Sequence, residues 1–150
     1  MEHNNMNKRF LRSVRLLAEC YHAFEKVSGA QARKSGLTPS QFDIIATLGN
    51  TSGMTFKELG EKTLITKGTL TGVVDRLEEK GLVRRGCKME DRRSTIVQLT
   101  EDGQSEFERV FTAHIAFCQQ PFDDYAEADF AALEKQLTKL KTTLDATGKD

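Results

Sequence analysis

The sequence predicts a mainly α-helical protein with one small β-hairpin. Apolar residues recur at steps of three and four over most of the 150 residues, which is the spacing of helical stripes. Between residues 82 and 99 this pattern gives way to two short β-prone runs. The length is sufficient for one core but short for two independent domains, so we expect a single domain over residues 1–150.

Long helices with an apolar stripe are expected near both ends of the chain. The first stripe comprises Phe10, Val14, Leu17, Tyr21 and Phe24, and the second comprises Phe130, Leu133, Leu137, Leu140 and Leu144. Either stripe alone fits an intramolecular core equally well. Together they favour an interface between two copies of the chain. The candidate dimerisation residues are Phe10, Val14, Leu133, Leu137, Leu140 and Leu144.

Two helix starts in the middle of the chain carry capping signals. Thr38 precedes Pro39 and Gln41, and Thr55 precedes Glu58. In both places the threonine can accept a hydrogen bond from the amide three residues later, while the Gln or Glu side chain reaches back. We therefore expect one helix to begin at Pro39 and a second, shorter helix to begin after Thr55.

A third helix follows residues 65–66 and is expected to end near Gly81. Its apolar stripe is Leu70, Val73, Val74 and Leu77. The opposite face is small and polar, and consists of Lys67, Gly68, Thr69, Thr71, Gly72 and Arg76. Two helices separated by a few residues form a candidate helix-turn-helix, and the DNA major groove admits a helix with such a slim face. One alternative is that Thr69, Thr71 and Arg76 form a merely solvated face. In others, Asp75 and Arg76 pair locally, or Arg76 orients the helix and does not touch DNA.

The β-prone runs 82–85 and 95–99 predict an antiparallel hairpin joined by the polar residues 86–94. Lys88, Arg92 and Arg93 make its tip basic, so that it can follow a DNA backbone or enter a minor groove. A further helix is expected to start at Thr100, because an oxygen cap is followed by acidic residues. Its expected apolar stripe is Phe107, Val110, Phe111, His114, Ile115 and Cys118.

The charge is polarised along the chain although its total is zero. Residues 55–100 hold ten Lys or Arg against seven Asp or Glu, whereas residues 101–150 hold five against eleven. The middle segment can therefore approach phosphate, and the acidic C-terminal third should face away from it.

These features resemble a known family. Residues 66–81 (TKGTLTGVVDRLEEKG), the LVRR that follows, and residues 91–103 (DRRSTIVQLTEDG) are similar to the signature of the MarR (multiple antibiotic resistance regulator) family, and the helix order is similar over nearly the whole chain. The resemblance implies a winged helix-turn-helix lobe at 37–100 and a helical dimerisation region at 8–35 and 101–147. It also implies a homodimer, expected to act as a repressor, that places two recognition helices in successive major grooves of a palindromic operator.

The resemblance carries several residue roles onto this sequence. Thr69, Thr71 and Arg76 match recognition-helix positions, and Asp91 and Arg93 match the Asp-x-Arg of the wing. In the family this Asp commonly braces an arginine and the wing arginine enters the minor groove, so Arg93 is the first choice for that contact and Arg92 the second. Gly72 departs from relatives with a long polar side chain there, so one base contact is missing or is supplied elsewhere.

Relatives in this family often release DNA when a small phenolic or anionic aromatic compound occupies a crevice beside the DNA-binding lobe. By analogy, the effector-binding candidates are Leu17, Tyr21, Phe24, Phe42, Ile45, Phe111 and His114. The alternative is that this aromatic stripe is core and that His114 is a satisfied core histidine.

Three cysteines without a CxxC spacing argue against a disulfide framework and a zinc site. Peroxide-sensing relatives have their reactive thiol at the position of Val14, and Cys20 lies six residues further along. Cys20 is therefore expected to be a small buried hydrophobe, and redox sensing by Cys20 is kept as an alternative. Cys87 in the wing has basic neighbours, which makes redox sensing there an alternative hypothesis. His3, His22 and His114 lack ligand spacing, and no metal or cofactor is expected.

Two other classes of function remain as alternatives. A winged helix can dock a protein partner, and salt dependence discriminates this from DNA binding. An enzyme is not expected, because no catalytic constellation occurs at a convincing spacing. The sequence also lacks an apolar run long enough for a membrane span and a signal-peptide pattern, so the expectation is a soluble cytoplasmic protein.

Overall fold

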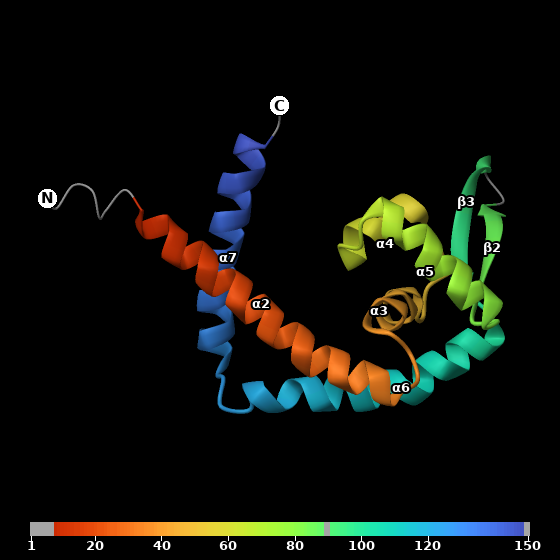
Figure 1. The fold of residues 1–150 in the computed structure, drawn as a ribbon, viewed down its shortest axis with the longest axis horizontal. Helices are drawn as coiled ribbons and strands as arrows, with labels where there is room; N and C mark the ends of the chain where they lie inside the picture. The colour runs from red at the N-terminus through yellow and green to blue at the C-terminus, as the bar shows by residue number, and fades with distance from the viewer. Residues whose placement is uncertain (1–7, 89–90, 149–150) are drawn as a thin grey trace, which may run out of the picture. The chain divides into compact units, whose positions relative to one another are not determined.

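The computed structural model describes residues 8–88 and 91–148, with the side chains of residues 87–93 outside the description. The chain forms two compact units, Met1–Cys118 and Gln119–Asp150. The elements are α2 (Arg9–Lys34), α3 (Pro39–Leu48), β1 (Met54–Thr55), α4 (Phe56–Thr63), α5 (Lys67–Glu79), β2 (Val83–Lys88), β3 (Asp91–Leu99), α6 (Glu101–Gln119), the 3₁₀ turn η1 (Gln120–Phe122) and α7 (Glu127–Thr147) (Figure 1). The expected fold class, mainly α with a small β wing, is confirmed.

Both predicted capping boxes are present. The Gln41 amide donates to Thr38 Oγ1 at 3.2 Å, and the Thr38 amide donates to Gln41 Oε1 at the same distance. At the start of α4 the Glu58 amide donates to Thr55 Oγ1 at 3.2 Å, and the Thr55 amide donates to Glu58 Oε2 at 3.4 Å. These bonds satisfy amides that a helix leaves unpaired, and they fix where α3 and α4 begin.

The end of α5 is set by the backbone conformation of Gly81. Gly81 has φ +74°, a left-handed conformation that glycine adopts without strain. The Leu82 amide donates to the Leu77 carbonyl at 3.0 Å, and the Gly81 amide donates to the Glu78 carbonyl at 2.9 Å. This Schellman arrangement ends the helix and turns the chain directly into β2.

The sheet has three antiparallel strands in the order β1–β3–β2. Two features differ from the sequence-based expectation. The short strand β1 pairs Met54 with Val97 and was not predicted, because two residues are too few for a visible alternation. The hairpin strands also extend into the segment 86–94 that was expected to be a loop, with Cys87 opposite Thr95. Backbone pairing in an exposed hairpin does not require apolar side chains, so the polar sequence of residues 86–94 gave no sign that these residues pair.

Helix α6 begins as predicted, because the Gly103 amide donates to Thr100 Oγ1 at 3.0 Å. Its buried face includes Phe107, Val110, His114 and Cys118. Ile115 was expected on this face and is instead 47% exposed. Residues 111, 114 and 118 already fill the stripe at helical spacing, and Ile115 lies beside it.

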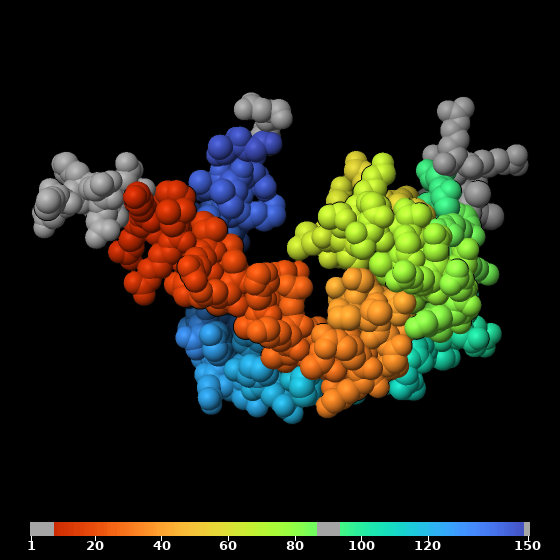
Figure 2. Space-filling view, viewed as in Figure 1, coloured from red at the N-terminus to blue at the C-terminus, as the bar shows by residue number. Residues whose placement is uncertain are grey.

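The apolar stripes at the two ends of the chain are open in the single chain. In α2 the side chains of Phe10, Val14, Leu17, Tyr21 and Phe24 are between 38% and 61% exposed, and this helix forms the red to orange surface in Figure 2. In α7, Leu133, Leu137 and Leu144 are exposed as well, and no residue of the helix is buried. The core of the first unit is built by residues of α3, α4, α5, the sheet and α6.

Candidate nucleic-acid interface

Helix α5 separates a buried face from an open polar one. Leu70, Val74 and Leu77 are almost completely buried, and Val73 packs partly against the core. The six residues expected on the other face are all exposed: Lys67, Gly68, Thr69, Thr71, Gly72 and Arg76. Atoms of α4 and α5, coloured yellow to green, form part of the surface in Figure 2. The structure therefore places these six residues together on one accessible helix face.

Packing within the chain does not require glycine at either of the two glycine positions of this face, Gly68 and Gly72. A Cβ built on Gly68 or on Gly72 would have no heavy atom within 4 Å. Both lie within a helix, where glycine is less favourable than alanine by about 1 kcal/mol. A side chain at either position would meet no neighbour in the single chain, and its absence leaves room for a close approach to the helix backbone.

The N-terminus of α5 is open to an anion. Thr66 occupies the capping position, but its side chain makes no bond to a backbone amide of the helix. Instead Thr66 Oγ1 donates to Thr69 Oγ1 at 3.1 Å. The Thr69 amide donates to the Thr66 carbonyl at 3.0 Å, whereas the amides of the exposed residues Lys67 and Gly68 have no side-chain cap. The helix dipole favours an anion at this end.

Arg85 joins the wing to α5. Its guanidinium donates to Asp75, donates to Glu78 Oε1 at 3.1 Å, and lies 5.6 Å from the centroid of the Phe56 ring. The hydrogen bond to Asp75 is the main cause that raises the pKa of Arg85 further above its usual value. Sequence reasoning missed this role, although Asp75 and Glu78, spaced three residues apart, share one helix face.

The ion pair of Arg85 removes one alternative for the α5 polar face, the local pairing of Asp75 with Arg76, and leaves the DNA contacts of this face a prediction. Asp75 pairs with Arg85 on β2 and not with its neighbour Arg76. Within the described ranges 8–88 and 91–148, Arg76 has no carboxylate within ion-pair distance. The Arg76 guanidinium is thus exposed and available to a partner.

The predicted wing residues lie outside the described side chains. The backbone places Lys88 at the end of β2 and residues 91–93 at the start of β3, so the four positions lie at the tip of the hairpin. Contacts of Lys88, Arg92 and Arg93 with DNA, and the bracing role of Asp91, stay predictions. The same holds for the thiol of Cys87.

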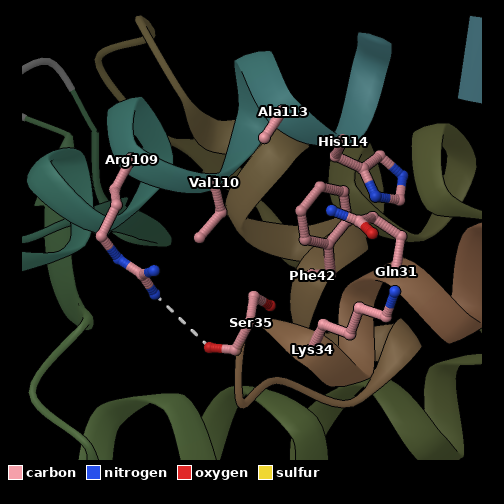
Figure 3. A pocket seen from close by; sticks show the side chains of 8 residues that line it. All are labelled: Gln31, Lys34, Ser35, Phe42, Arg109, Val110, Ala113 and His114. Carbon is pink, nitrogen blue, oxygen red and sulfur yellow. Dashed lines mark hydrogen bonds between the residues drawn. The ribbon is translucent and has the colours of Figure 1, made fainter. Parts of the chain in front are cut away.

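The predicted effector residues do not share one cavity. Tyr21 and Phe24 line a hollow of about 380 Å³ between α2 and the start of α3. Phe42 and His114 line a different pocket of about 120 Å³, between the end of α2, α3 and α6 (Figure 3). Ile45 is fully buried in the core, and Leu17 lines neither hollow. Phe111 stacks on Phe107, with ring centroids 4.7 Å apart.

The pocket of Figure 3 combines an apolar wall with cationic groups. Phe42, Val110 and Ala113 form the wall, whereas Lys34 and Arg109 contribute the charges. Arg109 donates to the Ser35 carbonyl at 3.4 Å and also pairs with Glu106, and Lys34 lies 5.8 Å from the centroid of Phe117. The lining contains no carboxylate.

His114 connects α6 to α2 and α3 in the interior. Its Nε2 lies 3.2 Å from Ser28 Oγ and 3.5 Å from Cys118 Sγ, and its ring centroid lies 4.0 Å from that of Phe42. Nδ1 is buried without a hydrogen-bond partner among the described residues. Burial lowers the pKa of this histidine, because it disfavours the charged imidazolium.

This burial predicts a pH-dependent stability. The pKa of His114 is below 6.5 in the folded chain and is 6.5 in the unfolded chain, which therefore binds the proton more tightly. The contribution of the neutral ring is fully present above pH 6.5 and is lost as the pH falls below it, with a slope of at most about 1.4 kcal/mol per pH unit. Urea unfolding at pH 5 to 8 should show this slope in the wild type and a smaller one in His114→Phe. Equal slopes in both proteins would contradict the assignment.

The two cysteines with described side chains differ in exposure, and redox sensing by Cys20 stays a prediction. Cys118 is buried, and its pKa is raised by desolvation. Cys20 is exposed, which differs from the expected buried position, because its side of α2 has no neighbour in the single chain. Among the described residues no group of three His, Cys, Asp or Glu side chains could hold a metal ion. No helix in the described part of the chain is both long and apolar enough to cross a membrane.

The fold and the open face of α5 define a winged helix-turn-helix protein of the DNA-binding class. Comparisons with known proteins extend this. The MarR family model matches residues 37–95. The chain is 27% identical over 135 residues to the transcriptional regulator MhqR of Bacillus subtilis, covering 90% of this chain and 93% of MhqR. It is 30% identical over 105 residues to the uncharacterized regulator YsmB of the same organism, covering 70% and 72%.

Solved structures agree with these relatives. AbsC, a MarR family transcriptional regulator from Streptomyces coelicolor, superposes with a TM-score of 0.79 at 27% identity, over 91% of this chain and 94% of AbsC. BpsR of Bordetella bronchiseptica, whose DNA binding is regulated by 6-hydroxynicotinic acid, gives 0.73 at 25% identity, over 87% and 98%. This chain belongs to the MarR family and is a DNA-binding transcriptional regulator. The relatives named here are regulators and not enzymes.

Proposed function

We propose that the chain acts as a homodimer that inserts the open face of α5 from each copy into successive major grooves of an inverted-repeat operator, and that it represses transcription there. The single observation that carries the proposal is the α5 face, where six small or cationic residues are exposed opposite a fully buried stripe. The major groove admits a helix with such a slim polar face. Residues 37–100 form the DNA-binding lobe in this proposal, and residues 8–35 and 101–147 form the dimerisation region.

Dimerisation is supported by the open apolar stripes of α2 and α7. Leu133, Leu137 and Leu144 lie at heptad-like spacing and are exposed in the single chain. Large apolar groups at this density cost free energy in water unless another surface covers them. We expect the wild type to sediment as a dimer and Leu137→Glu to sediment as a monomer at micromolar concentration. A monomeric wild type at the same concentration would contradict this part of the proposal.

Operator binding can be tested before the operator sequence is known. Duplexes selected from a random pool by the wild-type chain should share an inverted repeat, with half-site centres about 34–36 Å apart. Binding should fall steeply as salt rises, because phosphate contacts release counterions. A protein-interaction module, the alternative function, would select no common sequence and would show little salt dependence.

The chemistry of the α2–α3–α6 pocket supports an effector that is a small organic anion. Lys34 supplies positive charge, Arg109 supplies a guanidinium that also pairs with Glu106, and Phe42 and Val110 supply an apolar wall (Figure 3). The pocket includes Ser35, at the start of the connection between α2 and α3, and Phe42 of α3, whose neighbour is Gln41. Gln41 in turn accepts a hydrogen bond from Lys80 at 3.2 Å, at the end of α5. Occupation of the pocket is thereby linked to the position of α5.

Thermal-shift screening with a set of small aromatic acids tests the effector proposal. A compound that binds should raise the melting temperature of the wild type and lower its affinity for the selected duplex. Lys34→Gln should weaken that shift, whereas the control Lys26→Gln, in the separate α2–α3 hollow, should not. A weaker thermal shift in Lys26→Gln and an unchanged shift in Lys34→Gln would indicate that the effector binds in the α2–α3 hollow instead.

A further inference from the structure

Leu64 stands out in the turn between α4 and α5. It ends α4 in a left-handed conformation with φ 59° and ψ 14°, and its amide donates to the Gly60 carbonyl at 3.0 Å. Glycine adopts this conformation without strain and asparagine tolerates it, whereas a bulky side chain is strained there. Asn50 is the other non-glycine residue with positive φ among those described. The turn thus has an unfavourable residue at a position where better ones exist.

The Leu64 side chain gains nothing from the rest of the chain. It is 75% exposed, which is the largest value among the exposed large apolar residues that the structure describes. Its neighbours point inward, because Leu59 is fully buried and Ile65 packs partly against the core. The other exposed apolar side chains of this size lie on α2, on α6 or in the second unit, outside residues 37–100. The dimer stripes therefore do not explain Leu64.

We propose that Leu64 is an apolar DNA-contact residue, whose side chain packs against deoxyribose or a thymine methyl group beside the phosphate held at the start of α5. This rests on the proposed function. Leu64 lies three residues before Lys67, and Thr66, Lys67, Gly68 and Thr69 after it are all exposed. A duplex seated on the N-terminus of α5 meets this turn first. The apolar groups that a duplex presents to a side chain there are sugar rings and the thymine C5 methyl.

The proposal gives an unusual signature, because removal of Leu64 should help folding and harm binding. Leu64→Gly and Leu64→Asn relieve the backbone strain, so their melting temperatures should equal or exceed that of the wild type. Their affinity for the duplex selected by the wild type should fall about tenfold, which corresponds to about 1.4 kcal/mol. Leu64→Met keeps an apolar side chain of similar size and should bind within about twofold.

Controls separate this role from the alternatives. Asn50→Gly changes another left-handed residue and should leave DNA affinity unchanged. A duplex with uracil in place of thymine distinguishes the two contacts. Weaker wild-type binding to this duplex, with no further loss in Leu64→Gly, identifies the methyl group. An unchanged tenfold difference between wild type and Leu64→Gly identifies the sugar.

Wild-type affinity in Leu64→Gly, or a lower melting temperature in both strain-relieving variants, overturns the inference. So does a loss of binding that is accompanied by dissociation of the dimer. A wild type that binds no duplex overturns the proposed function as well.

Discussion

Gly103→Ala is expected to lower the free energy of unfolding by about 3 kcal/mol. An alanine Cβ at this position would lie 1.9 Å from the carbonyl oxygen of Leu82 and 3.0 Å from its carbonyl carbon. That oxygen accepts a hydrogen bond from the Thr100 amide at 3.1 Å, at the junction where α6 leaves the sheet. The obstacle is backbone, so a side-chain rotation cannot relieve the overlap. Helix α6 has to move away from the winged-helix lobe.

The matched control for Gly103→Ala is Gly72→Ala. Both glycines are helical, but a Cβ on Gly72 has no neighbour within 4 Å. The helix preference for alanine should therefore act alone and stabilise the chain by up to about 1 kcal/mol. Urea unfolding of both variants measures the difference. If Gly103→Ala is as stable as the wild type, α6 does not pack against Leu82 as the structure describes.

The combined charge reversal Lys67→Glu, Arg76→Glu is expected to lower the affinity for the selected duplex about a hundredfold or more. Both side chains lie exposed on α5, and Arg76 has no carboxylate partner among the described residues. Reversal replaces attraction to phosphate with repulsion in each copy of a dimer. The slope of log affinity against log salt should also decrease in magnitude by about one for each phosphate that the variant no longer neutralises.

Lys135→Glu, Lys139→Glu provides the control for that experiment. These exposed lysines of α7 lie in the acidic C-terminal third, so the change in total charge is the same. Operator affinity should change by less than about threefold, as expected of long-range charge effects at physiological salt. Equal losses in both double variants, with both still dimeric in sedimentation, would indicate that net charge, and not the α5 face, governs binding.

The sequence predicted the helices because their signals are local. Thr38 and Thr55 indicate the starts of α3 and α4, because their capping partners lie three residues away. The Leu70–Leu77 stripe identifies the buried side of α5. Strand β1 and the full length of the hairpin depend on pairing between distant segments, which carries no local pattern. The exposure of Ile115 depends on which side of α6 faces the core. Helical periodicity in the sequence locates that side only approximately, so a residue at its edge can be assigned wrongly.

The candidate site was predictable to a similar extent. The open face of α5 follows from the buried stripe on its other side, so its six members could be named from the sequence. The Arg85 link to Asp75 joins a strand to a helix and needed the fold. The expected single effector crevice separates into two hollows, because Ile45 is in the core and Phe111 packs on Phe107.

Methylation interference on the selected duplex tests the central proposal most directly, because it reports which groove the protein enters. Methyl groups on guanine N7 lie in the major groove, and those on adenine N3 lie in the minor groove. Insertion of α5 from two copies predicts interference by N7 methylation in two half-sites, with centres about 10 base pairs apart. Binding that tolerates every N7 methylation and is blocked only by methylation at adenine N3 would contradict the proposal that α5 reads the major groove.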